Sequence, residues 1–261
     1  MNSTGPEFTY NVLNICGRES IDILTPDDPE YPRMLKHIDR YPVILFAKGD
    51  SSILGDDKRL PFAMVGTRNA TVKGLKTAEA YAGMLSEAGF LIVSGGALGI
   101  DTASHKGAIK TGNPTVAVLG SGIGAEYLKT NRSLRYSISE NGVVISEMFP
   151  FEEPHRGSFP LRNRILAGMT AGTLVVEAGK RSGSVITAGL AGEYGRSVFV
   201  IPGESTNPPC AGVNSLIEDG GTPVIRPLDI VSELEPSYPG FFKSLKNREK
   251  LDILTEELAQ R

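Results

Sequence analysis

The chain has 261 residues, of which 40% are hydrophobic and 22% charged, a composition typical of a globular protein that can bury a full core. Its net charge of -3 and its pI near 5.7 argue against capture of duplex DNA by a broadly basic surface, so any nucleic-acid site must be a local basic patch. Two distant cysteines and the lack of an apolar run of about 20 residues argue against a disulfide framework, a zinc ribbon and a membrane span, and we expect a cytoplasmic protein.

The first sixty residues show little regular periodicity. Residues 1–20 are expected to be a tag or a disordered start. Residues 21–59 are punctuated by prolines, and 43–47 is their only strand-like run. We therefore expect residues 21–59 to form an N-terminal extension that packs on a larger domain.

Residues 60–226 alternate short apolar runs with segments of helical periodicity. The apolar runs predict strands at 62–65, 91–94, 116–119, 143–146, 174–177 and 198–201. The segments between them predict helices at 73–88, 101–111, 133–140, 162–169 and 184–194. Strands that are apolar on both faces and separated by helices indicate a parallel sheet covered on both sides. We therefore predict an α/β fold with a doubly wound, mainly parallel, Rossmann-like sheet and helices on both faces.

The last segment, 227–261, is denser in charge than the domain before it. Its pattern predicts a C-terminal polar helical tail. We expect this segment to be too short for a winged-helix domain.

Glycine-rich turns follow most of the predicted strands, at 66–68, 94–99, 120–124 and 202–203. The carboxyl ends of parallel strands hold the ligand crevice of an open sheet, and glycines there let backbone amides approach an anion. These turns therefore predict an anion-binding rim. The alternative is that strand-to-helix turns need glycine for their backbone geometry alone.

The run FPLRNR at 159–164 sets an aromatic ring, an amide and two guanidinium groups in six positions, with Arg156 just upstream. Guanidinium groups pair with phosphate and an aromatic face stacks on a base, so the cluster favours single-stranded nucleic acid as its ligand. The alternative is that the arginines are solvated or salt-bridged and that Phe159 belongs to the core.

Enzyme signatures are weak or missing. Gly120, Gly122 and Ala125 match a dinucleotide-binding fingerprint, but they follow the third predicted strand instead of the first. The chain has no P-loop, HExxH or nucleophile-elbow motif. Asp101 and His105, four residues apart on a predicted helix, suit a catalytic or metal pair, or equally an N-cap and a hydrogen-bonded histidine. Because no third ligand is evident, we favour the structural interpretation and expect no metal, cofactor or catalytic residue.

Several short motifs follow one another in a fixed order between residues 28 and 225. They are DPEYP at 28–32, VGTR at 65–68, IVSGG at 92–96, GID at 99–101, ISE at 145–147, FPLRNR at 159–164, VEA at 176–178 and SGS at 182–184. In the number and order of these motifs the chain resembles the DprA/Smf DNA-processing proteins of natural transformation.

The resemblance implies a Rossmann-like protein that binds and protects single-stranded DNA, helps load the RecA recombinase onto it and catalyses no reaction. It also implies a homodimer. The positions that match the family's DNA-binding motifs are Gly66, Thr67, Arg68, Ser94, Gly95, Gly96, Arg156, Phe159, Arg162, Asn163 and Arg164. The turns would offer amides and a guanidinium group to phosphates, Phe159 would contact a base, and residues 162–164 would begin the following helix. As an alternative, Asn163 satisfies loop carbonyls and one arginine pairs with Glu177.

The chain also departs from the family. The family often carries an N-terminal helical domain and sometimes a C-terminal winged helix, and the sequence indicates neither. Near Tyr127, Gly124 and Leu128 stand where the family usually has an aspartate and a proline, which predicts a differently shaped loop.

A rival function is that of a LOG-like nucleoside monophosphate phosphoribohydrolase, because a phosphate-lined crevice on such a sheet could serve a nucleotide. That family uses a PGGxGTxxE loop. The nearest match here is Gly172 and Thr173 with Glu177, which is one residue too long and precedes a strand instead of following it.

Overall fold

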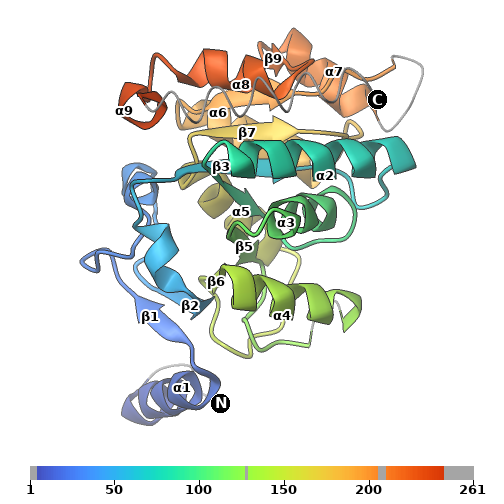
Figure 1. Cartoon of the computed structure of the whole chain (residues 1–261). Coiled ribbons are helices and arrows are strands. Elements are labelled where there is room, and N and C mark those ends of the chain that lie inside the picture. Colours follow the sequence, from blue (N-terminus) through green and yellow to red (C-terminus); the bar gives the residue numbers. More distant parts are fainter. Residues whose placement is uncertain (1–4, 127–128, 205–209, 244–261) are drawn as a thin grey trace.

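The computed structural model of the chain describes residues 5–126, 129–204 and 210–243. The strands in these ranges are β1 (Asp22–Leu24), β2 (Leu45–Gly49), β3 (Leu60–Val65), β4 (Phe90–Ser94), β5 (Thr115–Leu119), β6 (Val143–Ser146), β7 (Gly172–Val175), β8 (Ser197–Val200) and β9 (Thr222–Pro223). They form one sheet in the order β1-β2-β6-β5-β4-β3-β7-β8-β9 (Figure 1). β1 pairs antiparallel with β2, and β2 with β6, whereas the other neighbours are parallel.

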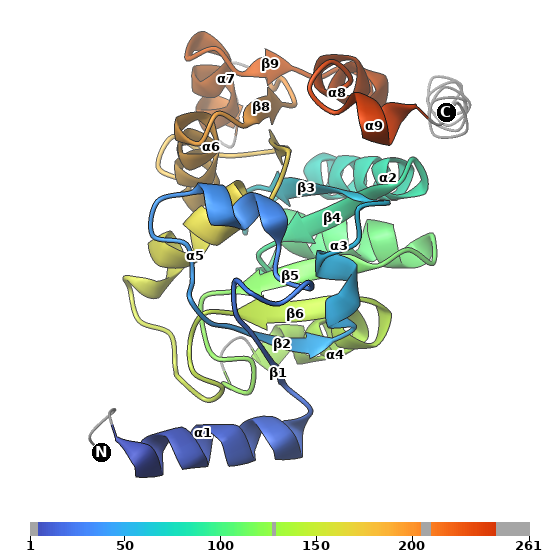
Figure 2. The ribbon, with the colours of Figure 1, turned by 90° about the vertical axis from the view of Figure 1, so that its left-hand side faces the viewer.

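Helices cover both faces of this sheet (Figure 2). One face packs against α2 (Val72–Glu87), α3 (Ile100–Lys110), α4 (Arg132–Asn141) and α8 (Pro227–Leu234). The other face packs against α5 (Ser158–Gly168), α6 (Gly183–Glu193) and α7 (Ala211–Glu218). The remaining helices are α1 (Pro6–Glu19), α9 (Pro239–Phe242) and the 3-10 turns η1 (Arg33–His37), η2 (Ser51–Leu54) and η3 (Lys129–Asn131). The predicted doubly wound, Rossmann-like architecture is therefore confirmed.

Strand β4 shows why the sequence lacks alternating polar residues. Phe90 and Ile92 pack into the core beneath α2 and α3, whereas Leu91 and Val93 pack into the core beneath α5 and α6. Successive side chains of a strand point to opposite faces, and here both faces are dry. A strand in this position must be apolar throughout.

The connections place a crevice at the end of β3. From β3 the chain adds β4, β5 and β6 on one side and then returns to add β7, β8 and β9 on the other. Adjacent strands β3 and β7 are thus followed by connections that leave in opposite directions. Such a switch point opens a crevice at the carboxyl ends of the strands, which is where ligands bind in open α/β sheets.

The elements predicted between residues 60 and 226 are all found, with their ends displaced by up to four residues. The largest displacement is at α5, which begins at Ser158 and not at Arg162. Pro160 therefore lies in the first helical turn, where a missing amide costs no hydrogen bond. Phe159 and the arginines that follow it belong to one helix.

The N-terminal segment is more ordered than the sequence predicts. Residues assigned to a tag or a disordered start form α1, whose Cys16 packs with Ile21 and Phe46. Residues 21–59 do more than pack on the domain, because β1 and β2 extend the main sheet beyond β6. Short antiparallel strands of this kind give little periodic signal.

The C-terminal segment also differs from the predicted polar tail. Within its described part, α8 and α9 are present, and the rings of Phe241 and Phe242 lie 5.4 and 6.0 Å from that of Phe90. Residues 244–261 of the predicted tail, and Tyr127 and Leu128 of the unusual loop, lie outside the described residues. No helix in the described ranges is long and apolar enough to cross a membrane.

Candidate nucleic-acid interface

A cavity of about 490 Å³ opens at the carboxyl ends of β3 and β7, at the switch point of the sheet. Three segments supply most of its wall, namely the turn after β3, the first two turns of α5, and the loop that leads from β7 into α6. Residues far apart in the chain thus meet around one opening. Of the glycine-rich turns expected to form an anion-binding rim, the one at 66–68 lines this cavity, and those at 120–124 and 202–203 do not.

The turn after β3 is held by backbone hydrogen bonds. The Thr67 amide donates to the carbonyl oxygen of Glu177 at 2.7 Å, and the Ile100 amide donates to the carbonyl oxygen of Thr67 at 3.2 Å. Gly66 permits this close packing, because a Cβ there would lie 2.4 Å from Ile100 Cγ1. The Thr67 amide is used within the chain, so what the turn presents to the cavity is the guanidinium group of Arg68.

Arg68 and Phe159 meet at the mouth of the cavity. The guanidinium carbon of Arg68 lies 5.4 Å from the centroid of the Phe159 ring, a cation–π distance. Gly120 leaves room for the ring, since a Cβ at that position would lie 2.9 Å from Phe159 Cδ1. The sequence analysis assigned these two residues to one site, and the structure brings them together in the cavity wall.

Arg162 lies at the inner wall of the cavity and is 8% exposed. Its Nη1 donates to the carbonyl oxygen of Gly95 at 2.7 Å and also to that of Val118. Burial raises the pKa of the neighbouring Asp101, and the positive charge of Arg162 opposes that rise. Arg162 is therefore tied into the fold by two carbonyls and a buried carboxyl, which leaves it poorly placed to bind an external phosphate.

Ser94, Gly95 and Gly96 lie beneath the cavity and not on its surface. All three are buried, and the Ser94 hydroxyl donates to the carbonyl oxygen of Met64 at 2.6 Å. A Cβ at Gly95 would lie 2.3 Å from the Arg162 guanidinium group. This geometry does not support their assignment to the anion rim, because Arg162 lies against the backbone at this turn.

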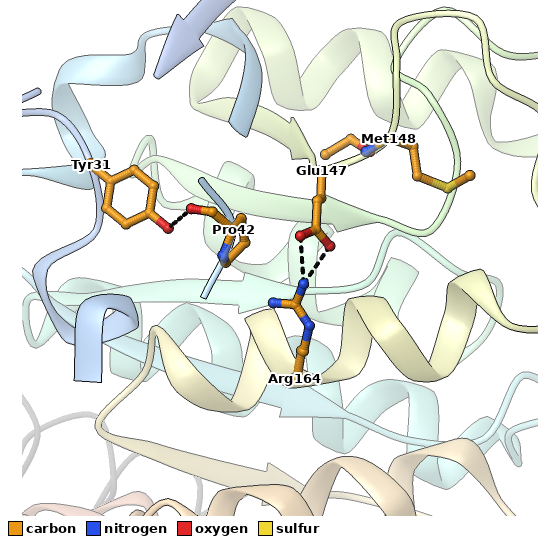
Figure 3. A network of polar contacts seen from close by, with 6 residues as sticks. Tyr31, Pro42, Glu147, Met148 and Arg164 are labelled. Carbon is orange, nitrogen blue, oxygen red and sulfur yellow. Dashed lines mark hydrogen bonds and ion pairs between the residues drawn. The ribbon is translucent and has the colours of Figure 1, made fainter. Parts of the chain in front are cut away.

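Arg164 does not line the cavity, and its guanidinium group faces Glu147, the residue after β6 (Figure 3). Its Nη2 lies 2.5 and 2.6 Å from the two carboxylate oxygens of Glu147, and its side chain is 14% exposed. The expected alternative partner, Glu177, instead accepts the Thr71 amide at 2.8 Å. Arg164 thus forms an internal ion pair with Glu147, and this geometry does not support its assignment to the predicted DNA-binding residues.

Asn163 and Arg156 take different positions. Asn163 lines the cavity while its Nδ2 donates to the carbonyl oxygen of Gly183 at 3.3 Å, which joins α5 to the start of α6. Arg156 is exposed in the loop before α5, three residues ahead of Phe159, and lies outside the cavity wall. Arg156 can therefore contact only what extends beyond the cavity.

Two further cations of the cavity were missed by the sequence analysis. Lys180 and Arg181 belong to the loop between β7 and α6, and both line the cavity. The signal was available, since KRSGS follows the carboxyl end of a predicted strand and leads into a helix. With Arg68 they give the opening three positive charges.

Asp101 and His105 form no reactive pair. His105 is fully buried, its Nδ1 lies 2.9 Å from the Thr115 hydroxyl, and burial followed by the charge of Arg162 lowers its pKa to about 3. Among the described residues, no group of three or more acidic, histidine or cysteine side chains is arranged to hold a metal ion. The geometry supports the hydrogen-bonded histidine. The expected N-cap is wrong, because Gly99 is the N-cap of α3 and Asp101 instead accepts a hydrogen bond from the Ala97 amide at 3.3 Å.

The two candidate enzyme motifs are also engaged within the fold. A Cβ at Gly122 of the dinucleotide fingerprint would lie 2.1 Å from the carbonyl oxygen of Phe149, so the chain itself covers the position where a pyrophosphate would approach. Glu177, the carboxylate of the hydrolase alternative, is 4% exposed and bonded to Thr71. Neither motif opens into the cavity.

Comparison with known proteins finds relatives that match most of this chain. The family model described as DNA recombination-mediator protein A matches residues 22–235. Protein Smf of Synechocystis is 37% identical over 226 residues, which cover 86% of this chain and 57% of the relative. DNA processing protein DprA of Streptococcus pneumoniae is 41% identical over 209 residues, which cover 80% of this chain and 72% of the relative. The chain therefore spans little more than half the length of the Synechocystis protein.

Solved structures of similar proteins share the fold of this chain. The X-ray structure of DNA processing protein A from Streptococcus pneumoniae aligns with a TM-score of 0.78 and 37% identity, and covers 87% of this chain and 80% of that one. The Helicobacter pylori structure, reported for its unique mode of binding single-stranded DNA, aligns with a TM-score of 0.73 and 27% identity. That alignment covers 84% of this chain and 97% of the Helicobacter pylori chain.

Proposed function

Because the chain belongs to the DNA recombination-mediator protein A family, we propose that it binds single-stranded DNA in the switch-point cavity and passes it to a recombinase without breaking a bond. The observation that carries the proposal is Arg68 stacked on Phe159 beside Lys180 and Arg181. Guanidinium and ammonium groups bind phosphates, and an aromatic ring offers a surface for a base.

The cavity also fits an unpaired strand better than a duplex. Its cations are concentrated at one opening of a protein whose net charge is -3, and that opening is a concave pocket and not a long basic face. A splayed single strand can insert a base beside Phe159 while its phosphates meet Arg68 and, farther out, Arg156. The Helicobacter pylori relative, which binds single-stranded DNA, supports this choice.

The family's description as a recombination mediator supports a RecA-type recombinase as the protein partner. We also propose a homodimer, since two cavities on one strand would raise the affinity for long DNA without any new kind of contact. Light scattering across a concentration series tests the dimer, and co-elution with RecA on single-stranded DNA tests the partner.

The DNA-binding test is a salt titration with fluorescent oligonucleotides. The affinity of Arg68→Ala and Arg156→Ala should be lower than that of the unchanged protein, and the slope of log affinity against log salt should fall by about 0.7 for each phosphate that the variant no longer binds. Arg33→Ala is the matched control, because Arg33 is exposed and paired with Asp57 away from the cavity wall. Equal binding by Arg68→Ala and the control would place the strand elsewhere.

The same preparation distinguishes binding from catalysis. Incubation with AMP should release no free adenine, because Asp101, the one acid that lines the cavity, and Glu177 of the hydrolase motif are both buried. Adenine release that disappears in Glu177→Gln would favour the hydrolase.

A further inference from the structure

A second, smaller cavity lies between α2 and α3, directly beside the first. Its volume is about 300 Å³, at the lower end of small-ligand sites. Arg68 and Asn69 line both cavities, so the turn after β3 forms the ridge between them. A ligand that contacts Arg68 in the first cavity is therefore adjacent to the second cavity.

The loop before α3 packs tightly on this ridge. Gly99 has a φ of 79°, and a Cβ there would lie 2.3 Å from the carbonyl oxygen of Thr67. Glycine adopts this left-handed backbone without strain and leaves the space that the close contact needs. The loop consequently brings Leu98 next to Arg68, where its side chain is 41% exposed.

Besides the shared Arg68, the second cavity combines an apolar wall with one further cation, Lys106. Leu75 and Leu98 provide apolar surface, and Lys106 is exposed at the edge and forms no ion pair with any described residue. The one acid in the wall, Glu79, is already paired with Lys110. The leucines can thus contact an apolar ring, and the lysine can contact an anion attached to it.

We propose that this groove binds the neighbouring nucleotide of the strand held in the first cavity. The base lies against Leu75 and Leu98, Lys106 contacts the next phosphate, and Arg68 lies between the two nucleotides. The proposal rests on the proposed function and names a subsite of it. Because Arg68 lines both cavities, a ligand that occupies both must cross the ridge between them. A strand of several nucleotides can do so, whereas a free nucleotide would occupy one cavity only.

Two variants test the groove in the full chain with an oligothymidylate of about twelve nucleotides, a length within single-strand site sizes. Lys106→Gln should weaken binding by about threefold to tenfold and lower the salt slope by about 0.7, as expected for one phosphate contact. Leu98→Asp should weaken binding further, because it places a negative charge beside the strand. Both side chains are exposed, so thermal unfolding should be unchanged.

Lys76→Gln is the matched control, since Lys76 is a lysine of α2 outside the groove. It should bind like the unchanged protein. If Lys106→Gln and Leu98→Asp bind as tightly as this control while Arg68→Ala binds weakly, the groove is not a subsite and the proposed function stands. If the unchanged protein itself binds no single-stranded DNA, the proposed function fails first.

Discussion

The structure predicts that Arg162 stabilises the fold and that its replacement by methionine unfolds the protein more readily. Arg162 is 8% exposed and donates to the carbonyl oxygens of Gly95 and Val118. Methionine has a similar length but leaves these carbonyls without their donor and removes the positive charge that opposes the raised pKa of the buried Asp101. Leaving a buried hydrogen-bond acceptor without its donor costs about 1–3 kcal/mol, so losing the donor to two such carbonyls is a large share of the roughly 5–15 kcal/mol that stabilises a domain.

The assay is urea unfolding followed by circular dichroism, for Arg162→Met, Asp101→Asn and the double variant. The double variant should lose less stability than the sum of the single variants, because asparagine leaves no charge that needs Arg162. The pH dependence has a defined sign. Burial raises the pKa of Asp101 in the folded protein, so the free energy of unfolding falls as the pH rises above the pKa that Asp101 has in the unfolded chain. Because Arg162 opposes this rise in pKa, the fall is larger in its absence. The deficit of Arg162→Met should therefore shrink as the pH falls.

A contrary result would be equally informative. If Arg162→Met unfolds at the same urea concentration as the unchanged protein but binds oligonucleotides with lower affinity and a smaller salt slope, Arg162 contacts DNA directly. The internal bonds to Gly95 and Val118 would then contribute nothing measurable, and the interpretation of the inner wall would be wrong.

Two other groups give predictions of the same kind. The pKa of His105 is lowered to about 3, so unfolding should become easier as the pH falls from about 6.5 toward that value, by about 1.4 kcal/mol per pH unit from this one group. Chemical unfolding of His105→Phe should show a flatter pH profile, and an unchanged profile would contradict the assignment. Arg164→Ala should lower stability by about 1–3 kcal/mol, because the partly exposed Glu147 loses its partner, while the affinity for oligonucleotides stays unchanged. A loss of affinity without a loss of stability would return Arg164 to the DNA-binding set.

The parallel strands β3 to β8 could be predicted from the sequence because they are largely apolar on both faces. Residues such as those of β4 leave few alternatives to a buried parallel strand. The first and last elements could not be predicted in the same way. β1 has three residues, and α1 and α9 are stabilised by packing against distant partners such as Phe46 and Phe90. Local periodicity contains no information about those partners.

The sequence predicts a site residue well only where its availability depends on its own type and its place next to a strand, and not on a partner elsewhere in the chain. Arg68 follows a strand at the sheet's carboxyl edge, and a turn there has little to cover its side chain. Arg162 and Arg164 looked equally available, but their partners Asp101 and Glu147 lie far away in the sequence. Whether a guanidinium group is free for phosphate depends on such distant acids, and a single sequence does not display them.

Helix geometry nevertheless shows which of the three residues after Leu161 face the cavity and which does not. Successive residues of an α-helix are about 100° apart, so positions i, i+3, i+4 and i+7 share one face. Since α5 begins at Ser158, Phe159 shares a face with Arg162, Asn163 and Leu166, and these are its residues in the cavity wall. Arg164 lies about 140° away from Phe159 on this helix and must face elsewhere. A helix that began at Arg162 would leave Phe159 outside and give no such division, so the assignment of these side chains depends on where the helix starts.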